Sequence, residues 1–175
     1  MTERCSECGF DYDGLALADG AAALRAFGRR YRAPLTRVLP GEDGLALVRA
    51  HPMPGTWSAL EYACHVRDVL AVQRERIELA RREDTPAFEP MGREERVERD
   101  RYNDQVPSAV ADQLAARAET LAGVVEELSD DELARTAVYP DRGEQTLGWV
   151  VRHTVHEGEH HLLDVGRVLR AARGR

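Results

Sequence analysis

The chain has 175 residues, of which 43% are hydrophobic, 31% are charged and 6% are aromatic. This length is sufficient for one domain with its own hydrophobic core, and the many Ala, Leu, Glu and Arg residues favour helices. The formal net charge of −7 argues against a general nucleic-acid-binding protein, because such a protein needs a basic surface to neutralise phosphates. We therefore expect a single helical domain, residues 1–175, in which residues 1–14 form an N-terminal extension.

The N-terminal extension carries a Cys5-x-x-Cys8 motif and lacks the apolar stretch of a signal peptide. No apolar run in the chain is long enough to cross a bilayer, so we expect a cytoplasmic protein without a membrane partner. With Cys64 the chain has three cysteines, which cannot form a disulfide framework. The motif is typical of half a zinc site, with two further ligands from a dimer mate or from His51, of a redox pair, or of two ordinary thiols.

A first helix is expected over residues 21–39, with Asp19 as its N-cap residue. Pro34 should kink or break this helix, because proline removes a backbone hydrogen bond and clashes with the preceding turn. Residues 40–55 are rich in proline and glycine, which predicts a connection with a short helix at residues 45–50.

A second helix is expected over residues 58–83, where Ser58 and Glu61 have the spacing of a capping box. Residues 84–106 hold a dense run of charges, which is typical of a solvated loop or a short surface helix. This segment predicts a long crossover connection between the second and third helices.

A third helix is expected over residues 108–128, with Ser108 as its cap, and residues 129–132 predict a further short helical turn. Residues 140–143 predict a turn, and a fourth helix is expected over residues 146–172. Four long amphipathic segments without a clear alternating strand pattern predict an all-α fold, a four-helix bundle. Because of the long crossover, its topology need not be a simple up-down-up-down arrangement.

The fourth helix carries a cluster of histidines. They are His153, His156, His160 and His161. At about 100° per residue, the first three share a stripe with Trp149 and Leu163. Because both of these residues are apolar, we expect the stripe to face the bundle interior and His161 to lie at the rim or on the surface. His156 and His160 are four residues apart, a spacing that lets two imidazoles bind one ion.

His65 lies on the inward face of the second helix, near Trp57 and Val72. A lone buried histidine is more often an ordinary core residue, but a histidine pair on another helix favours a shared metal site. The spacing predicts one divalent ion held by His65, His156 and His160, with at least one open position. Four acidic residues lie within a turn of a ligand and are candidates to orient ligands or to move protons: Glu61, Asp68, Glu157 and Asp164.

Two motifs in the helical segments point to a known family. The first is W-S-x-x-E-Y-x-x-H-V-x-D, residues 57–68, and the second is L-x-x-x-x-x-H-x-x-H-x-x-x-H, residues 147–160. Together they resemble the DinB-like superfamily, which includes bacillithiol- and mycothiol-dependent S-transferases and the metal-binding domain of maleylpyruvate isomerase. The resemblance covers nearly the whole chain. It implies a four-helix bundle with one long crossover and a metal ion, usually zinc or nickel, held by His65, His156 and His160.

We therefore expect a metal-dependent enzyme, a transferase or isomerase in which a low-molecular-weight thiol binds the open metal position. A divalent cation lowers the pKa of a bound thiol, and the thiolate can then attack an electrophilic substrate. The Arg- and Ala-rich composition suggests a GC-rich genome, for which the resemblance implies mycothiol as the thiol. The alternative is a metal-binding or stress-response module without turnover, and either form is compatible with a homodimer.

Residues 156–160 also read HExxH, the signature of zinc peptidases, with Glu157 as the general base. The familiar zinc peptidases take a third ligand downstream, whereas this chain has no histidine or glutamate after His161. Glu157 with His160 also matches half of a di-iron site, but no second Glu-x-x-His occurs in the chain. The three-histidine site is therefore favoured over both alternatives.

Overall fold

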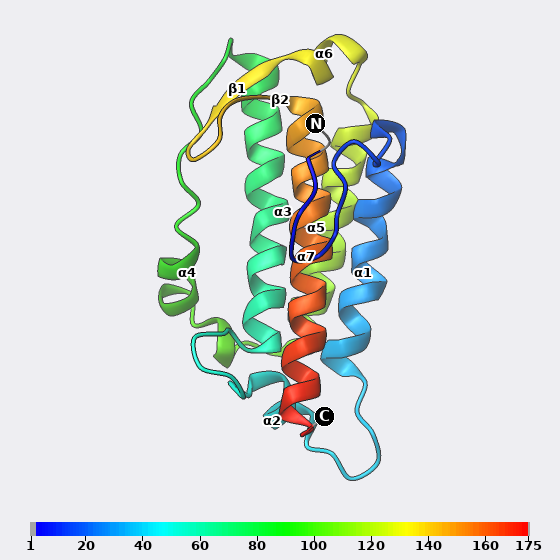
Figure 1. The fold of residues 1–175 in the computed structure, drawn as a ribbon, viewed down its shortest axis with the longest axis vertical. Coiled ribbons are helices and arrows are strands. Elements are labelled where there is room, and N and C mark those ends of the chain that lie inside the picture. Colours follow the sequence, from blue (N-terminus) through cyan, green and yellow to red (C-terminus); the bar gives the residue numbers. More distant parts are fainter. Residues whose placement is uncertain (1–2, 175) are drawn as a thin grey trace.

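Four long helices run side by side along the molecule in this computed structural model, which describes residues 3–174 (Figure 1). They are α1 (Gly20–Thr36), α3 (Ala59–Arg82), α5 (Pro107–Glu126) and α7 (Leu147–Ala172). Helices α1 and α3 each pack against both α5 and α7, so they occupy opposite corners of the bundle. The four-helix bundle predicted from the sequence is confirmed.

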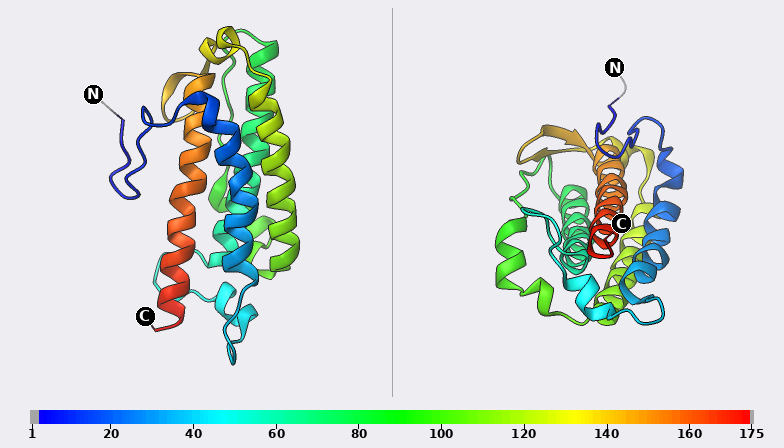
Figure 2. Two further views of the ribbon diagram at one scale, coloured as in Figure 1. Left: turned by 90° about the vertical axis from the view of Figure 1, so that its right-hand side faces the viewer. Right: turned by 60° about the horizontal axis from the view of Figure 1, so that its bottom comes forward.

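A long crossover connects the second and third long helices, as predicted. Residues 83–106 leave the end of α3 and return along its outer side, so α3 and α5 run in the same direction (Figures 1 and 2). This crossover contains α4 (Arg93–Arg99) and a 3-10 turn (Tyr102–Asp104). Its first part is fixed where the backbone N–H of Phe88 donates to the carbonyl of Val138 over 2.9 Å.

The helix ends follow local sequence signals. Ser58 begins α3 with the predicted capping box: its hydroxyl accepts the N–H of Glu61, whose carboxylate accepts the N–H of Ser58. Helix α5 begins at Pro107, because proline suits the first helical turn, so Ser108 is not its cap. Helix α1 ends at Thr36, in the turn that contains Pro34, and not at residue 39.

A small two-stranded sheet that was not predicted lies at one end of the bundle (Figure 1). Strands β1 (Thr136–Tyr139) and β2 (Gly143–Thr146) pair antiparallel on either side of the predicted turn. Four residues per strand are too few to show a clear alternation of apolar and polar side chains. Two short helices complete the fold, α2 (Gly44–Arg49) and α6 (Asp130–Ala134).

The space between the four helices is filled by apolar side chains, among which Phe27 and Tyr31 of α1 are fully buried. The hydroxyl of Tyr31 donates to the carbonyl of Gly158 over 2.7 Å, which joins α1 to α7. The N-terminal segment, residues 3–12, lies outside the bundle along α7 (Figures 1 and 2). None of the helices in the described part of the chain is long and apolar enough to span a membrane.

Candidate metal centre

Helix α7 carries, on two neighbouring faces, side chains of types that could bind a metal ion. On each face the ligand atoms lie within 4.8 Å of one another. We name the first set, which includes a histidine of α3, the interhelical cluster: His65, Glu157 and His161. We name the second set the N-terminal cluster: Cys5, Cys8, His156 and His160. Further close groups combine these side chains with His153 or Asp164.

The structure does not bring the three expected ligands together. His65 belongs to the interhelical cluster, whereas His156 and His160 belong to the N-terminal cluster. On α7 the pair Glu157 and His161 follows the pair His156 and His160 by one residue. The two pairs therefore point in directions about 100° apart around the helix axis. The stripe through His156 faces the N-terminal segment and not α3, because Tyr12 and Cys5 lie against it.

His65 is a buried histidine without a hydrogen bond. Its side chain is 3% exposed, and within residues 3–174 neither Nδ1 nor Nε2 has a hydrogen-bond partner. Nε2 lies 3.8 Å from Oε2 of Glu157, which is beyond hydrogen-bonding distance. Burial lowers the pKa of His65, which keeps the imidazole in the neutral form that binds metals. Because an unpartnered buried polar group is costly, this ring has the properties of a metal ligand.

His161 is held by carboxylates of its own helix. Its Nδ1 lies 3.0 Å from Oδ2 of Asp164, and its Nε2 lies 3.6 Å from Oε2 of Glu157. Burial lowers the pKa of His161, but Asp164 and Glu157 raise it more, to about 9. The ring therefore sits where two carboxylates favour a positive charge. Its side chain is only 12% exposed, so His161 lies mostly buried at the rim of a pocket and not on the open surface.

Glu157 lies between the two histidines. Burial raises its pKa, but the imidazoles of His161 and His65 hold the pKa of Glu157 well below its usual range. An ionised carboxylate with two imidazoles is a donor set that zinc and nickel accept. The sequence contained the signal for this set, since Glu157 and His161 are also four residues apart. From the sequence alone, Glu157 is favoured as an orienting or proton-transferring group and is considered as a ligand only in the di-iron alternative.

Two other acidic candidates lie away from the metal-binding groups. Glu61 belongs to the capping box of α3, and its Oε2 lies 2.7 Å from Nε2 of His51. Asp68 accepts a hydrogen bond from the hydroxyl of Tyr102 over 2.6 Å and pairs with Arg67. Their positions therefore give both carboxylates structural partners, and neither reaches the interhelical cluster.

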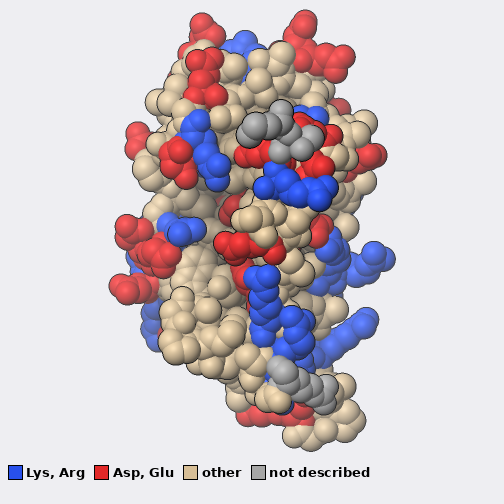
Figure 3. Space-filling view, viewed as in Figure 1, with Lys and Arg blue, Asp and Glu red and all other residues tan. Residues whose placement is uncertain are grey.

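A pocket of about 520 Å³ opens beside the interhelical cluster. His65, His153 and Glu157 line its inner wall, while residues 90–93 of the crossover and Tyr139 of β1 line the other side. On the face seen in Figure 3, acidic and basic side chains are interspersed. The interhelical cluster is thus within reach of a small molecule in this pocket.

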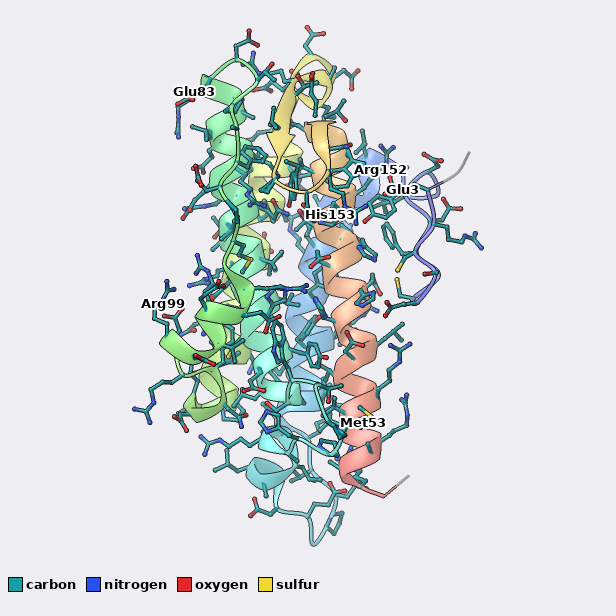
Figure 4. All side chains as sticks on the ribbon, turned by 60° about the vertical axis from the view of Figure 1, so that its left-hand side comes forward. Glu3, Met53, Glu83, Arg99, Arg152 and His153 are labelled. Atoms are coloured by element: carbon teal, nitrogen blue, oxygen red, sulfur yellow. The ribbon has the colours of Figure 1, made fainter. Side chains whose placement is uncertain are left out.

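The N-terminal segment covers the neighbouring face of α7. The hydroxyl of Tyr12 lies 2.9 Å from Nδ1 of His153 and 3.0 Å from Nδ1 of His156. Figure 4 shows His153 on α7 near this segment. A second pocket, of about 380 Å³, is lined by Glu7 of the segment together with His161. The sequence predicts that the stripe through His153 faces the bundle interior, whereas the structure places the N-terminal segment against it.

The side chains of the HExxH sequence do not converge on one site. In a peptidase the two histidines of this motif hold an ion and the glutamate acts beside it. Here His156 and His160 group with Cys5 and Cys8, whereas Glu157 groups with His65 and His161 and also with His153 and His156. No such group among the described residues holds His156, Glu157 and His160 together.

Comparison with known proteins agrees with this architecture. The sequence profile of the DinB superfamily matches residues 23–165, and no protein with a curated description matches the sequence. The chain is similar to YfiT from Bacillus subtilis, described as a probable metal-dependent hydrolase with an unusual four-helix bundle topology (TM-score 0.71, 18% identity, 86% of each chain). It is also similar to a mycothiol-dependent maleylpyruvate isomerase (TM-score 0.68, 18% identity, 89% of this chain and 62% of that chain). At 18% identity these likenesses concern the fold, whereas the profile match spans most of the sequence: the chain belongs to the DinB superfamily.

Proposed function

We propose that this chain is a metal-dependent enzyme, a transferase or isomerase that uses a low-molecular-weight thiol such as mycothiol. The interhelical cluster is its metal site in this proposal. The observation that carries it is His65, whose two buried ring nitrogens lack hydrogen-bond partners in the described chain and which faces Glu157 and His161. Proteins of similar fold include a probable metal-dependent hydrolase and a mycothiol-dependent isomerase.

The interhelical cluster suits a zinc or nickel ion. Two imidazoles and one carboxylate supply three ligands, which leaves a further position for a small molecule. Asp164 accepts the Nδ1–H of His161, so an ion that displaces the proton of Nε2 would bind the lone pair of this nitrogen. The ring of Trp57 lies 5.2 Å from that of His65, and this contact shields one side of the His65 ring from water.

Such an ion would supply the positive charge that keeps a thiol deprotonated at neutral pH. The pocket beside it is large enough for a small substrate. Arg76 and Arg93 line this pocket together with Asp141 and Glu157, and the two guanidinium groups with a bound metal ion would favour an electrophile that carries a carboxylate.

Tyr139 supplies a hydrogen-bond donor in the same pocket. Its oxygen accepts N–H groups of Gln73 over 2.5 Å and of Arg76 over 2.8 Å. Burial raises the pKa of Tyr139, so the hydroxyl keeps its proton and can donate it to a substrate oxygen. Oε1 of Gln73 is buried without a partner in residues 3–174, which leaves an acceptor for a substrate hydroxyl or amide.

Metal content of the purified chain tests the site. His65→Ala, Glu157→Gln and His161→Ala should each remove the ion, whereas His51→Ala changes a histidine outside the metal-binding groups and should retain it. Full metal content in the three cluster variants would refute the assignment. If the ion is held by His65, His156 and His160, it is retained in Glu157→Gln and His161→Ala.

Turnover is tested separately with mycothiol and an acidic electrophile such as maleylpyruvate. The metal-loaded chain should consume the substrate only when the thiol is present, and Tyr139→Phe should lower kcat while the metal content stays unchanged. If the metal-loaded chain leaves the substrate unchanged in the presence of the thiol, the result favours a metal-binding module without turnover.

A further inference from the structure

The N-terminal segment folds back on itself and presents both of its cysteines to α7. Arg4 and Asp11 form a β-bridge that closes the segment, and the backbone N–H of Cys5 donates to the carbonyl of Phe10 over 2.9 Å. In Figure 4 the sulfur atoms of this segment lie on its side toward α7. The two ends of the sequence are therefore joined at this face of the bundle.

A tight loop surrounds the sulfur of Cys5. Gly9 has a φ of 75°, in the left-handed region that glycine adopts without strain, and its N–H donates to the carbonyl of Cys5 over 2.9 Å. The loop therefore holds the side chain of Cys5 against His160 of α7.

The four side chains of the N-terminal cluster have the spacing of a metal site. Their ligand atoms all lie within 4.8 Å of one another, and Sγ of Cys5 is 3.7 Å from Nδ1 of His160. A tetrahedral zinc ion with Zn–S bonds of about 2.3 Å separates two sulfur ligands by about 3.8 Å. Only small shifts would therefore bring the four atoms into a tetrahedron.

The ring of His156 provides an independent observation. Its Nε2 is buried and has no hydrogen-bond partner among the described residues, while its Nδ1 lies 3.0 Å from the hydroxyl of Tyr12. An Nδ1–H donated to Tyr12 leaves a lone pair on Nε2. The ring of His160 directs Nδ1 toward Cys5, while its Nε2 lies 3.6 Å from Asp164 and 3.7 Å from Glu7, within the range of an ion pair.

We propose that Cys5, Cys8, His156 and His160 form a second metal site, a closed zinc site that fastens the N-terminal segment to α7. Two thiolates with two imidazoles are a typical ligand set of structural zinc, and four protein ligands leave no open position. The second site shares no ligand with the interhelical cluster. It also fixes Glu7 in the wall of the 380 Å³ pocket that reaches His161.

Zinc content of the full chain tests this site separately from the interhelical cluster. The chain is purified with a phosphine reductant and without chelator, and it should hold about two equivalents of divalent metal. The double variant Cys5→Ser/Cys8→Ser should lose one equivalent, and His65→Ala should lose the other. Cys64→Ala is the matched control, because it removes the third cysteine, which is buried elsewhere in the bundle, and should lose neither.

Cobalt substitution identifies the ligands. Cobalt(II) bound to thiolates absorbs strongly through charge transfer, so these bands should be present in the cobalt-loaded chain, retained in His65→Ala and absent from Cys5→Ser/Cys8→Ser. Unchanged metal content in the double variant would overturn the second site, as would a metal-free Cys5–Cys8 disulfide isolated under reducing conditions. If the double variant loses metal and His65→Ala loses none, the second site stands and the proposed function fails.

Discussion

Nε2 of His65 on α3 lies 3.8 Å from Oε2 of Glu157 on α7, and Nε2 of His161 approaches the same oxygen within 3.6 Å. Helices α3 and α7 pack directly against each other and run in opposite directions (Figure 1). A metal ion held by these three side chains would join the second and the fourth long helix. Its binding energy would therefore add to the stability of the folded chain.

Removal of the metal should lower the melting temperature without unfolding the bundle at room temperature, because the bundle has its own apolar core. At a free metal concentration of 100 times Kd, mass action predicts a loss of about 2.7 kcal/mol on chelation. The measurement is thermal unfolding of Cys5→Ser/Cys8→Ser with and without chelator, so that only the interhelical cluster contributes. In the same background, His65→Ala should melt at one temperature under both conditions. If the chelator does not change the melting temperature of Cys5→Ser/Cys8→Ser with His65 intact, these histidines are ordinary core residues.

Asp164→Asn should weaken metal binding at the interhelical cluster by about 10–100-fold, because Asp164 fixes the tautomer of His161. Binding is measured by competition with a chromophoric chelator in Cys5→Ser/Cys8→Ser, since Asp164 also lies 3.6 Å from His160. Asp112→Asn is the control, because Asp112 of α5 forms an exposed ion pair with Arg32 of α1 and belongs to neither cluster. Equal affinities of the two variants would contradict the orienting role of Asp164.

The helices were predictable because they depend on local signals. Ser58 and Glu61 define the start of α3 through their own hydrogen bonds, and the spacing of these two residues is visible in the sequence. The hairpin of residues 136–146 was not predictable in this way, since each strand is only four residues long. Its position depends on the crossover, where Phe88 donates to Val138.

The residue types of the candidate site were predictable from the sequence, but the rotation of α7 about its axis was not. Spacing allows both the pair His156 with His160 and the pair Glu157 with His161, and only packing decides which one faces α3. The apolar residues Trp149 and Leu163 suggest the rotation with His156 and His160 inward, but Leu163 is 45% exposed, so an apolar stripe alone does not decide which pair faces α3. The partners of the cysteine motif come from the other end of the chain, and no local pattern reports such a contact.

Gly158→Ala should destabilise the fold by about 1–3 kcal/mol, because a Cβ at this position would overlap the buried ring of Phe27. Gly123→Ala is the matched control in α5, where the added Cβ meets no atom within 4 Å among the described residues outside its own helical turns. It should raise the free energy of unfolding by roughly 0.5–1 kcal/mol, because alanine is the better helix former. Chemical denaturation of both variants measures the difference. Equal stabilities would mean that α1 and α7 do not approach as closely at Gly158 as the structure shows.

Asp68 should account for part of the acid sensitivity of the metal-free chain. Burial raises its pKa, but hydrogen bonds from Arg67 and Tyr102 hold the pKa of Asp68 below its ordinary value of 3.8. The folded state therefore favours the ionised carboxyl, and this stabilisation is fully present well above pH 3.8 and is lost as the pH falls below that value. Asp68→Asn should cost about 3–5 kcal/mol at neutral pH, because it leaves the buried Arg67 without its counter-charge.

The difference between wild type and Asp68→Asn should therefore shrink as the pH falls below about 3.8, where the wild-type carboxyl becomes protonated. Urea unfolding of both metal-free chains at each pH gives this difference. Asp112→Asn again serves as a control, since its exposed ion pair should contribute less than about 1 kcal/mol at any pH. A pH-independent difference for Asp68→Asn would mean that Asp68 titrates equally in the folded and unfolded chains.

Direct thiol binding is the sharpest test of the proposed chemistry, and the cobalt-loaded double variant Cys5→Ser/Cys8→Ser is suited to it. This variant keeps Cys64 as its one thiol, and burial raises the pKa of Cys64 to about 12, so that group stays protonated and away from the metal. Any thiolate-to-cobalt band must then come from an added thiol. Mycothiol or cysteine should produce such a band, and the same addition to a chain that also carries His65→Ala should produce none, because its ion is lost. If cobalt binds and no thiol changes its spectrum, the thiol-dependent reaction is wrong, while the ligand set of His65, Glu157 and His161 remains supported by the bound metal.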